Sequence, residues 1–176
     1  IQNTDFVPTW FDLAGVETPE EYRMDGVSLA TLFEDPTTSV RDHVYCEIGA
    51  SRAIKTKDWT YMALRFTSDQ VEEVEARPNS LKRLLGLSGG VARGAANPAA
   101  FDYDQLYDTS RDSDETRNLA QVPRHADMLA EMQALLIEDL RRFPDRPFGE
   151  FIPGGNALPI GGCDELLERA REGAEQ

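Results

Sequence analysis

The residue types that most often carry chemistry are scarce in this chain. It has two histidines, His43 and His125, and two cysteines, Cys46 and Cys163. Neither histidine has a His or Cys partner at metal-ligand spacing, so the sequence argues against a zinc site. Two thiols make no disulfide framework, and a single bridge and two free thiols both remain open. Cys46 lies in an apolar run and is expected in the core.

An acidic stretch in the second half of the chain invites a calcium interpretation, but it fails on position. Counted from Asp112, the sixth position of an EF-hand loop holds Arg117 instead of Gly, and the twelfth holds Pro123 instead of Glu. A solvated turn accounts better for these carboxylates. The glycines between Gly86 and Gly94 fit neither the phosphate-loop nor the dinucleotide spacing. The residues alone therefore indicate an α+β domain without a self-contained active site.

Periodicity and turn residues predict the elements that would position any functional side chain. Helices are expected over 5–15, 28–34, 69–77 and 123–143, and strands over 43–48, 51–56, 59–66 and 105–108. The strand at 59–66 is mainly apolar on both faces, which places it at the centre of a small antiparallel sheet. The helix from Pro123 has an apolar stripe suited to cover one face of that sheet.

Composition restricts the partners. The 176 residues include 32 acidic and 18 basic side chains, for a net charge of −14. This balance argues against nucleic acid and an anionic membrane surface as partners, because both attract an excess of Lys and Arg. No apolar run approaches the ~20 residues that span a bilayer. The chain begins at Ile1 without a signal-like segment, so we expect a segment of a longer protein.

Four segments, in order, resemble the sulfatase family. The family pattern D-I-x-P-T-x-x-D-x-A-G is approached by residues 3–15, Asn-Thr-Asp-Phe-Val-Pro-Thr-Trp-Phe-Asp-Leu-Ala-Gly, and D-G-x-S-L-x-x-L-L by residues 25–33. The pattern R-A-I-R-T-x-x-W-K-Y is approached by residues 52–61, and E-L-Y-D-L-x-x-D-P-x-E-x-x-N-L-A by residues 106–120. Departures are Thr60, where the family usually has Lys, and Ser113, where it has Pro.

This resemblance implies the C-terminal part of an alkaline-phosphatase-like α/β sulfatase fold, with a small antiparallel sheet packed against a long C-terminal helix. In the family, the catalytic formylglycine arises from a Cys or Ser in a C/S-x-P-x-R motif, and a set of Asp and Asn binds calcium, both N-terminal to the stretch matched here. Neither Cys46 nor Cys163 stands in such a motif. No catalytic or metal residue is carried over, and no cofactor is expected on this chain. Calcium and formylglycine are implied for the full-length enzyme.

The resemblance also divides the chain. Residues 1–38 would be helical segments packed on a missing N-terminal catalytic domain, 39–143 the C-terminal subdomain with an inserted loop at 67–103, and 144–176 a wrapping tail. Arg52 and His43 are the candidates for the border of the substrate cleft. A structural ion pair is the alternative for Arg52, and a structural or surface role for His43. Loops as long as the insertion are usually functional or mobile.

The implied function is that of a sulfatase C-terminal region, inactive alone, which supports the catalytic domain and borders the cleft for a sulfate ester such as a sulfated carbohydrate. The family suggests a periplasmic or secreted location. One alternative is a phosphate- or phosphonate-ester hydrolase of the same superfamily, and another is a stand-alone acidic module that binds a protein or glycan. A segment of an enzyme should expose the apolar faces of its first two helices, whereas a self-sufficient module would bury them.

Overall fold

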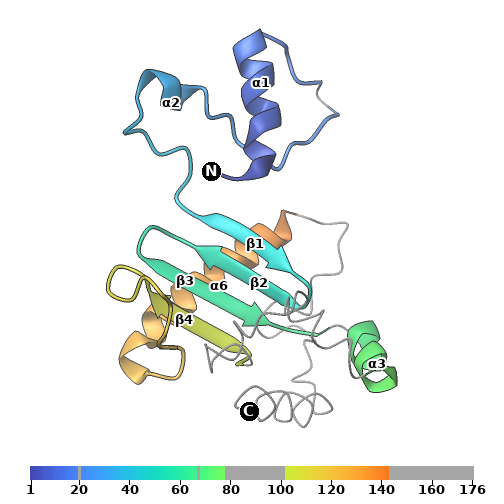
Figure 1. Ribbon diagram of the computed structural model, residues 1–176, viewed down its shortest axis with the longest axis vertical. Helices are drawn as coiled ribbons and strands as arrows, with labels where there is room; N and C mark the ends of the chain where they lie inside the picture. The colour runs from blue at the N-terminus through green and yellow to red at the C-terminus, as the bar shows by residue number, and fades with distance from the viewer. Residues whose placement is uncertain (20, 67, 78–101, 143–176) are drawn as a thin grey trace. The chain divides into compact units, whose positions relative to one another are not determined.

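The computed structural model describes residues 1–19, 21–66, 68–77 and 102–142 (Figure 1). The chain divides into two compact units, Ile1–Val44 and Tyr45–Gln176, and each is described by itself. The glycine-rich stretch of the inserted loop, the tail at 144–176 and Cys163 lie outside the described residues, so the expectations for them stay predictions.

The first unit contains the 3-10 helix η1 (Asn3–Asp5) and the helices α1 (Phe6–Ala14) and α2 (Thr31–Glu34). The helix α1 ends where the sequence predicted, because Gly15 adopts the left-handed conformation at φ 64°. The helix α2 ends at Asp35, which is extended as expected of a residue before Pro36.

Polar side chains hold the first unit together. Three of them lie on one face of the chain from the start of α1 into the helix. Each bonds to the segment 27–29, which follows α1 in the sequence. Val27 N–H donates to Asp5 Oδ1 at 3.0 Å, Leu29 N–H to Thr9 Oγ1 at 2.9 Å, and Ser28 Oγ–H to Asp12 Oδ2 at 2.6 Å. These bonds join the first two family-like segments and explain why their polar residues occur together.

Gly26 lets the two segments approach. A Cβ at this position would lie 2.0 Å from the Thr4 carbonyl oxygen and 2.4 Å from its carbonyl carbon. Both atoms belong to the backbone and cannot move aside as a flexible side chain would. Glycine is therefore required here for the close contact of two backbones.

The second unit is built on a small antiparallel sheet of β1 (Val44–Ile48), β2 (Ser51–Lys55), β3 (Trp59–Leu64) and β4 (Asp104–Asp108), in the order β1-β2-β3-β4 (Figure 1). The strand β3 pairs antiparallel with both β2 and β4. Gly49 and Ala50 alone connect β1 to β2, and so short a link joins only antiparallel neighbours. The predicted strands and the central place of β3 are confirmed.

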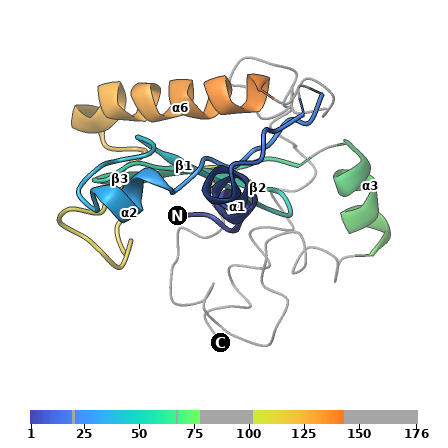
Figure 2. The ribbon, with the colours of Figure 1, turned by 90° about the horizontal axis from the view of Figure 1, so that it is seen from above.

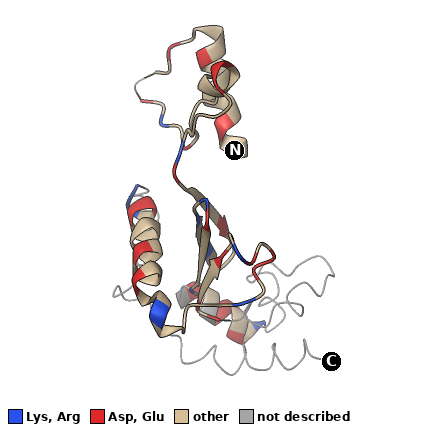
Figure 3. Ribbon diagram, turned by 90° about the vertical axis from the view of Figure 1, so that its left-hand side faces the viewer, with Lys and Arg blue, Asp and Glu red and all other residues tan. Residues whose placement is uncertain are grey.

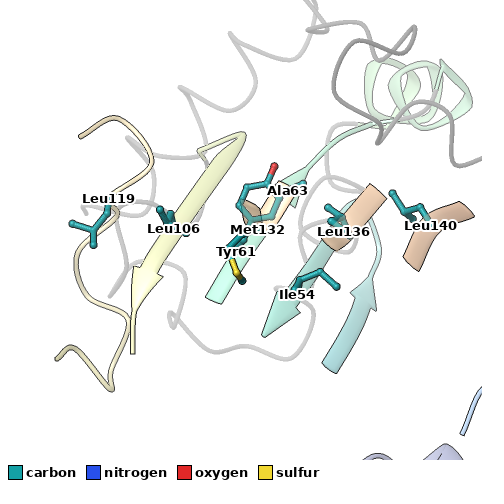
Figure 4. Packing of buried hydrophobic residues seen from close by; sticks show 8 residues of the cluster. All are labelled: Ile54, Tyr61, Ala63, Leu106, Leu119, Met132, Leu136 and Leu140. Atoms are coloured by element: carbon teal, nitrogen blue, oxygen red, sulfur yellow. The ribbon is translucent and has the colours of Figure 1, made fainter. Parts of the chain in front are cut away.

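One face of the sheet is covered by α6 (Ala126–Arg141), which follows the 3-10 helix η3 (Pro123–His125) (Figure 2). The predicted helix and its apolar stripe are confirmed, since Met132, Leu136 and Leu140 are buried. Acidic residues also recur along this helix (Figure 3). The core cluster joins sheet, helix and the segment after β4 through Ile54, Tyr61, Ala63, Leu106, Leu119, Met132, Leu136 and Leu140 (Figure 4).

One expectation about a single residue needs correction. Cys46 is exposed instead of buried, because β1 is an edge strand and Cys46, Glu47 and Ile48 all face solvent. The helix predicted over 69–77 forms as α3 (Ser68–Ala76). Its Val74 is fully buried, so this part of the insertion buries an apolar side chain.

Candidate functional site

Arg52 lies in β2, and the hairpin of β1 and β2 uses its side chain. Its Nε lies 3.2 Å from Glu47 Oε2, and its Nη1 donates to the carbonyl oxygens of Gly49 at 3.0 Å and Ser51 at 2.9 Å. The residue is buried, and it stands opposite Ala63 on the face that α6 covers. These contacts fit a structural ion pair. A place for Arg52 at a substrate cleft stays a prediction.

His43 is half-buried and immediately precedes β1, in the last residues of the first unit. Arg52 belongs to the second unit, so the two candidates for the substrate cleft come from different units. A role for His43 at a cleft also stays a prediction. The other histidine, His125, lies with its ring centroid 5.6 Å from that of Trp59 in a tilted contact.

Asn118 secures the segment that returns beside β4. Its Oδ1 accepts from the backbone N–H groups of Leu106 at 2.9 Å and Ala120 at 3.0 Å. Its Nδ2 donates to Asp102 Oδ2 at 2.9 Å and to the Asp104 carbonyl oxygen at 3.0 Å. The side chain thus uses both its amide oxygen and its amide nitrogen. Asn118 is therefore a structural residue in this region.

A second polar cluster joins β3, β4 and α6. The Tyr61 hydroxyl donates to Asp104 Oδ1 at 2.6 Å, and Arg65 Nη2 donates to the same oxygen at 2.8 Å. Gln133 Nε2 approaches the Tyr61 hydroxyl oxygen from α6 at 3.5 Å. Burial of the phenol and the neighbouring Asp104 carboxylate raise the pKa of Tyr61 far above its ordinary value. Tyr61 therefore stays a neutral hydrogen-bond donor.

In the acidic turn after β4, the Asp112 and Glu115 carboxylates accept hydrogen bonds from other groups of the same chain. The Asp112 carboxylate accepts from the backbone N–H groups of residues 116 and 117, both at 2.9 Å, and these bonds lower the pKa of Asp112. Glu115, at φ 54°, turns back so that its Oε1 accepts from Thr60 Oγ1 at 2.8 Å and lies 3.2 Å from Lys55 Nζ. The solvated-turn interpretation fits these bonds better than a cation loop does.

Asp5 is the charged centre of the first unit. Its carboxylate is fully buried and accepts from the Gln2 N–H at 2.6 Å, from the Val27 N–H, and from the Arg41 guanidinium. Burial raises the pKa of Asp5, but these three donors outweigh burial, so the pKa lies below its ordinary value of 3.8. Asp5 occupies the N-cap position of α1, although its side chain makes no cap bond to that helix.

The exposed face of the first unit is apolar. Phe6, Trp10 and Leu13 recur along α1 and are 48%, 61% and 60% exposed, and the rings of Phe6 and Trp10 stack with centroids 6.2 Å apart. Phe33 of α2 is 72% exposed. In α1 the polar face is bound within the unit while the apolar face is open. This is the reverse of the usual arrangement of a surface helix.

Within the described ranges, no group of three or more His, Cys, Asp or Glu side chains is placed to hold a metal ion. Nor does that part of the chain contain a helix long and apolar enough to cross a membrane. Gly86–Gly90 has the spacing Gly-x-Ser-x-Gly, but a nucleophile elbow needs a strand before it and a helix after it. That stretch lies outside the described residues, so we assign it no role.

Proteins of known type are similar to this chain in sequence and in fold. The chain is 31% identical over 135 residues to an ulvan-active sulfatase of Formosa agariphila, an alignment that covers 70% of this chain and 25% of the relative. The chain is a sulfatase relative. It spans about a quarter of the length of this curated protein, and its fold is that of the C-terminal subdomain of sulfatases. No family model matches the chain.

Solved structures agree on the fold. BT4656, determined in complex with its substrate D-glucosamine-2-N,6-O-disulfate, superposes with a TM-score of 0.53 at 22% identity, over 81% of this chain and 24% of that one. A putative sulfatase from Bacteroides thetaiotaomicron and BT1596, a 2-O glycosaminoglycan sulfatase, each superpose with a TM-score of 0.50 at 24% identity, over 80% of this chain and 25% of theirs. At these identities the likeness shows the fold alone.

The structure gives a role to three residues of the family-like segments in this chain. Asp5 and Asn118 each bind several backbone groups, and Gly26 admits a backbone contact. Sequence reasoning missed Arg41, the cation that pairs with Asp5, and Arg65, which pairs with Asp104. The polar spacing of Asp5, Thr9 and Asp12 was the available signal, since residues four and then three positions apart share one helix face.

Proposed function

We propose that this chain is the C-terminal part of a sulfatase, a sulfuric ester hydrolase, and that it supports the catalytic domain, borders the substrate cleft and is inactive alone. The sequence likeness to an ulvan-active sulfatase and the superposition on three longer proteins support this proposal. No residue of the chain is assigned a catalytic role, because the family's nucleophile and calcium ligands have no counterpart in its motifs.

The observation that carries the proposal is that α1 exposes its apolar face and binds its polar face within the unit. A stand-alone binding module would bury Phe6, Trp10 and Leu13, whereas a segment of a larger enzyme would present them to the remainder of that enzyme. These side chains are 48%, 61% and 60% exposed. We therefore favour the sulfatase segment over the acidic binding module, and we assign the apolar row of α1 to contact with the N-terminal catalytic domain.

The substrate proposed is a sulfate ester of a carbohydrate, like those named for two of the similar proteins. Formylglycine and calcium would reside in the N-terminal domain, where formylglycine supplies the nucleophile for attack on sulfur and calcium polarises the sulfate. The contribution of this chain is to hold the wall of the cleft in place through its sheet and α6. A periplasmic or secreted location belongs to the same proposal.

The test compares the 176-residue chain with the uninterrupted natural polypeptide in an aryl sulfate assay. The natural polypeptide should hydrolyse the sulfate ester, and the chain alone should not. In the natural polypeptide, Trp10→Asp should lower kcat by destabilising the contact with the catalytic domain, while Trp10→Phe keeps apolar area and should leave kcat nearly unchanged. Turnover by the chain alone would contradict the proposal.

The same assay separates the alternative within the superfamily. A natural polypeptide that hydrolyses phosphate or phosphonate esters faster than sulfate esters would show that the chain belongs to a phosphoryl-transfer enzyme. The nucleophile decides chemically, because formylglycine indicates a sulfatase and an unmodified Thr or Ser indicates phosphoryl transfer. Peptide mass spectrometry of the natural polypeptide distinguishes these residues directly.

A further inference from the structure

The strands β3 and β4 form one continuous hairpin although 39 residues, 65–103, separate them in the sequence. Their register runs from Trp59 opposite Asp108 to Ala63 opposite Asp104. Beyond the last pair, the Leu64 N–H donates to the Tyr103 carbonyl oxygen at 2.9 Å. The chain therefore re-enters the sheet within hydrogen-bond distance of the point where it left.

Arg65 and Asp104 lock this point from both strands. Arg65 Nη2 donates to Asp104 Oδ1 at 2.8 Å, and Arg65 Nη1 donates to the carbonyl oxygens of Tyr103 and Leu64. The hydroxyl of fully buried Tyr61 donates to the same Asp104 oxygen at 2.6 Å. Hydrogen bonds to an ionised partner are about twice as strong as neutral ones. The 16% exposure of the Arg65 side chain limits screening by solvent.

The residues that lead into β4 make further hydrogen bonds through Asp102. Asp102 accepts from Asn118 Nδ2 through Oδ2 at 2.9 Å, and from Gln105 Nε2 through its carbonyl oxygen at 3.1 Å. Residues 102–104 are thus bonded to β3 on one side and to the segment after β4 on the other. The bonded residues Arg65, Asp102, Tyr103 and Asp104 thus flank the segment 67–101 on both sides and lie outside it.

Among the described residues, the core between the sheet and α6 draws on elements outside the segment 67–101. Its buried members and the apolar side chains packed against them come from β1 to β4, the segment 119–122 and α6. The buried Val74 of α3 and the buried Phe66 lie outside this cluster. In the part of the chain that the structure describes, packing against α6 therefore involves the paired strands β3 and β4 and no residue of α3.

We propose that Arg65, Asp104 and Tyr61 form a root clamp that closes the base of the segment 67–101, so that the sheet and α6 stay assembled even when the chain is interrupted within that segment. The root clamp makes the connection between β3 and β4 dispensable for their association. This inference concerns the C-terminal subdomain alone and stands whether or not the enzyme is a sulfatase.

The test produces the protein as two co-expressed pieces, one ending at residue 85 and one beginning at residue 91, each with the sequence that adjoins it in the natural polypeptide. An affinity tag on the first piece should retain the second in equal amount, and the complex should unfold in one cooperative transition. Arg65→Met should weaken association of the pieces by about tenfold or more, because it removes charge-assisted bonds to Asp104 and Tyr103.

Arg111→Met is the matched control. Arg111 Nε lies 3.7 Å from Asp108 Oδ2 at the opposite end of β4, and its side chain is 84% exposed. Its loss should change association less than about twofold. Failure of the pieces to associate while the uninterrupted chain folds would overturn the proposal. So would an Arg65→Met effect no larger than that of Arg111→Met, because the pieces would then associate without the root clamp.

Discussion

The two units of this chain are stabilised in different ways. The first unit is held by polar side chains that bond to a neighbouring segment. Asp5 and Thr9 are buried, Asp12 bonds Ser28 at the surface, and Phe6 and Trp10 are exposed. The second unit packs an apolar core between a sheet and α6, with its polar clusters at the rim. The second unit therefore has an apolar core of its own, whereas the first exposes apolar side chains that we propose contact another part of a longer enzyme.

The contrast also predicts how each unit fails. A unit with an apolar core loses stability when a charge enters that core. A unit held by one buried carboxylate fails when the carboxylate is removed or protonated, because several donors lose their acceptor together. Introducing a carboxylate should therefore destabilise the second unit most, whereas removing a carboxylate should destabilise the first unit most.

The largest effect is expected from Leu136→Asp or Met132→Asp. Both side chains are only 1% exposed and belong to the core cluster beneath α6. An unpaired buried carboxylate costs several kcal/mol, comparable to the ~5–15 kcal/mol that stabilise a whole domain. Thermal unfolding of the second unit, followed by circular dichroism, should lose its cooperative transition. Ala134→Asp on the exposed side of α6 is the control and should melt within a few degrees of wild type.

Asp5→Ala should have the next largest effect, confined to the first unit. It leaves Arg41 and the N–H groups of Gln2 and Val27 without the acceptor they share, at a cost of about 3 kcal/mol. Amide hydrogen exchange should become fast throughout α1. Asp12→Ala removes only an exposed bond to Ser28 and should leave exchange in α1 nearly unchanged. Equal effects of the two substitutions would mean that Asp5 is not the centre of this unit.

Acid should unfold the first unit through the same group. The folded pKa of Asp5 lies below its ordinary value of 3.8, so the carboxylate contributes stability that is fully present above that pH and is lost as the pH falls through the folded pKa. Asp5→Asn should flatten this loss at the low-pH end. Acid titration of Trp10 fluorescence in a Trp59→Phe background measures it. Asp112→Asn in the second unit should leave that titration unchanged, although bonds from the backbone also lower the pKa of Asp112.

The smallest effect is expected from replacing residues 70–100 with a short Gly-Ser linker. The root clamp and the α6 side of the core remain, and a shorter loop lowers the closure cost by about 1–2 kcal/mol. Loss of the buried Val74 acts in the opposite direction. The melting temperature of the second unit should therefore change by only a few degrees. In the natural polypeptide, the replacement should alter the ranking of kcat/KM across several sulfate esters more than it alters the melting temperature. A large loss of melting temperature with an unchanged ranking would show that residues 70–100 are a structural element.

Much of the second unit could be predicted from sequence because its patterns are local. Trp59 to Phe66 is apolar on both faces, which identifies a central strand, and the stripe from Met128 to Leu140 identifies the covering helix. The exposure of Cys46 could not be read in this way. An edge strand and a core strand share the same composition, and only the strand order separates them.

The polar clusters were less accessible to sequence reasoning. Arg41 pairs with Asp5 across 36 positions and Arg65 with Asp104 across 39, separations at which no periodicity relates two residues. Glu115 adopts φ 54°, a conformation uncommon outside glycine, and this turn alone returns its carboxylate to Thr60. Of the candidates for the substrate cleft, Arg52 rested on the family resemblance and His43 on its place at the start of a strand, and no periodic pattern supported either.

We propose that the apolar face of α1 contacts the remainder of a longer enzyme. The 176 residues hold two tryptophans, so in this chain a Trp59→Phe background leaves Trp10 as the reporter. The emission maximum and the iodide quenching of Trp10 should be measured, in this chain and in the uninterrupted natural polypeptide, as the difference between each protein and its matched Trp10→Phe variant. Trp10 should be solvent-exposed and readily quenched in the chain, and blue-shifted and protected in the natural polypeptide. Trp10 protected already in the chain, or still quenched in the natural polypeptide, would contradict the proposal.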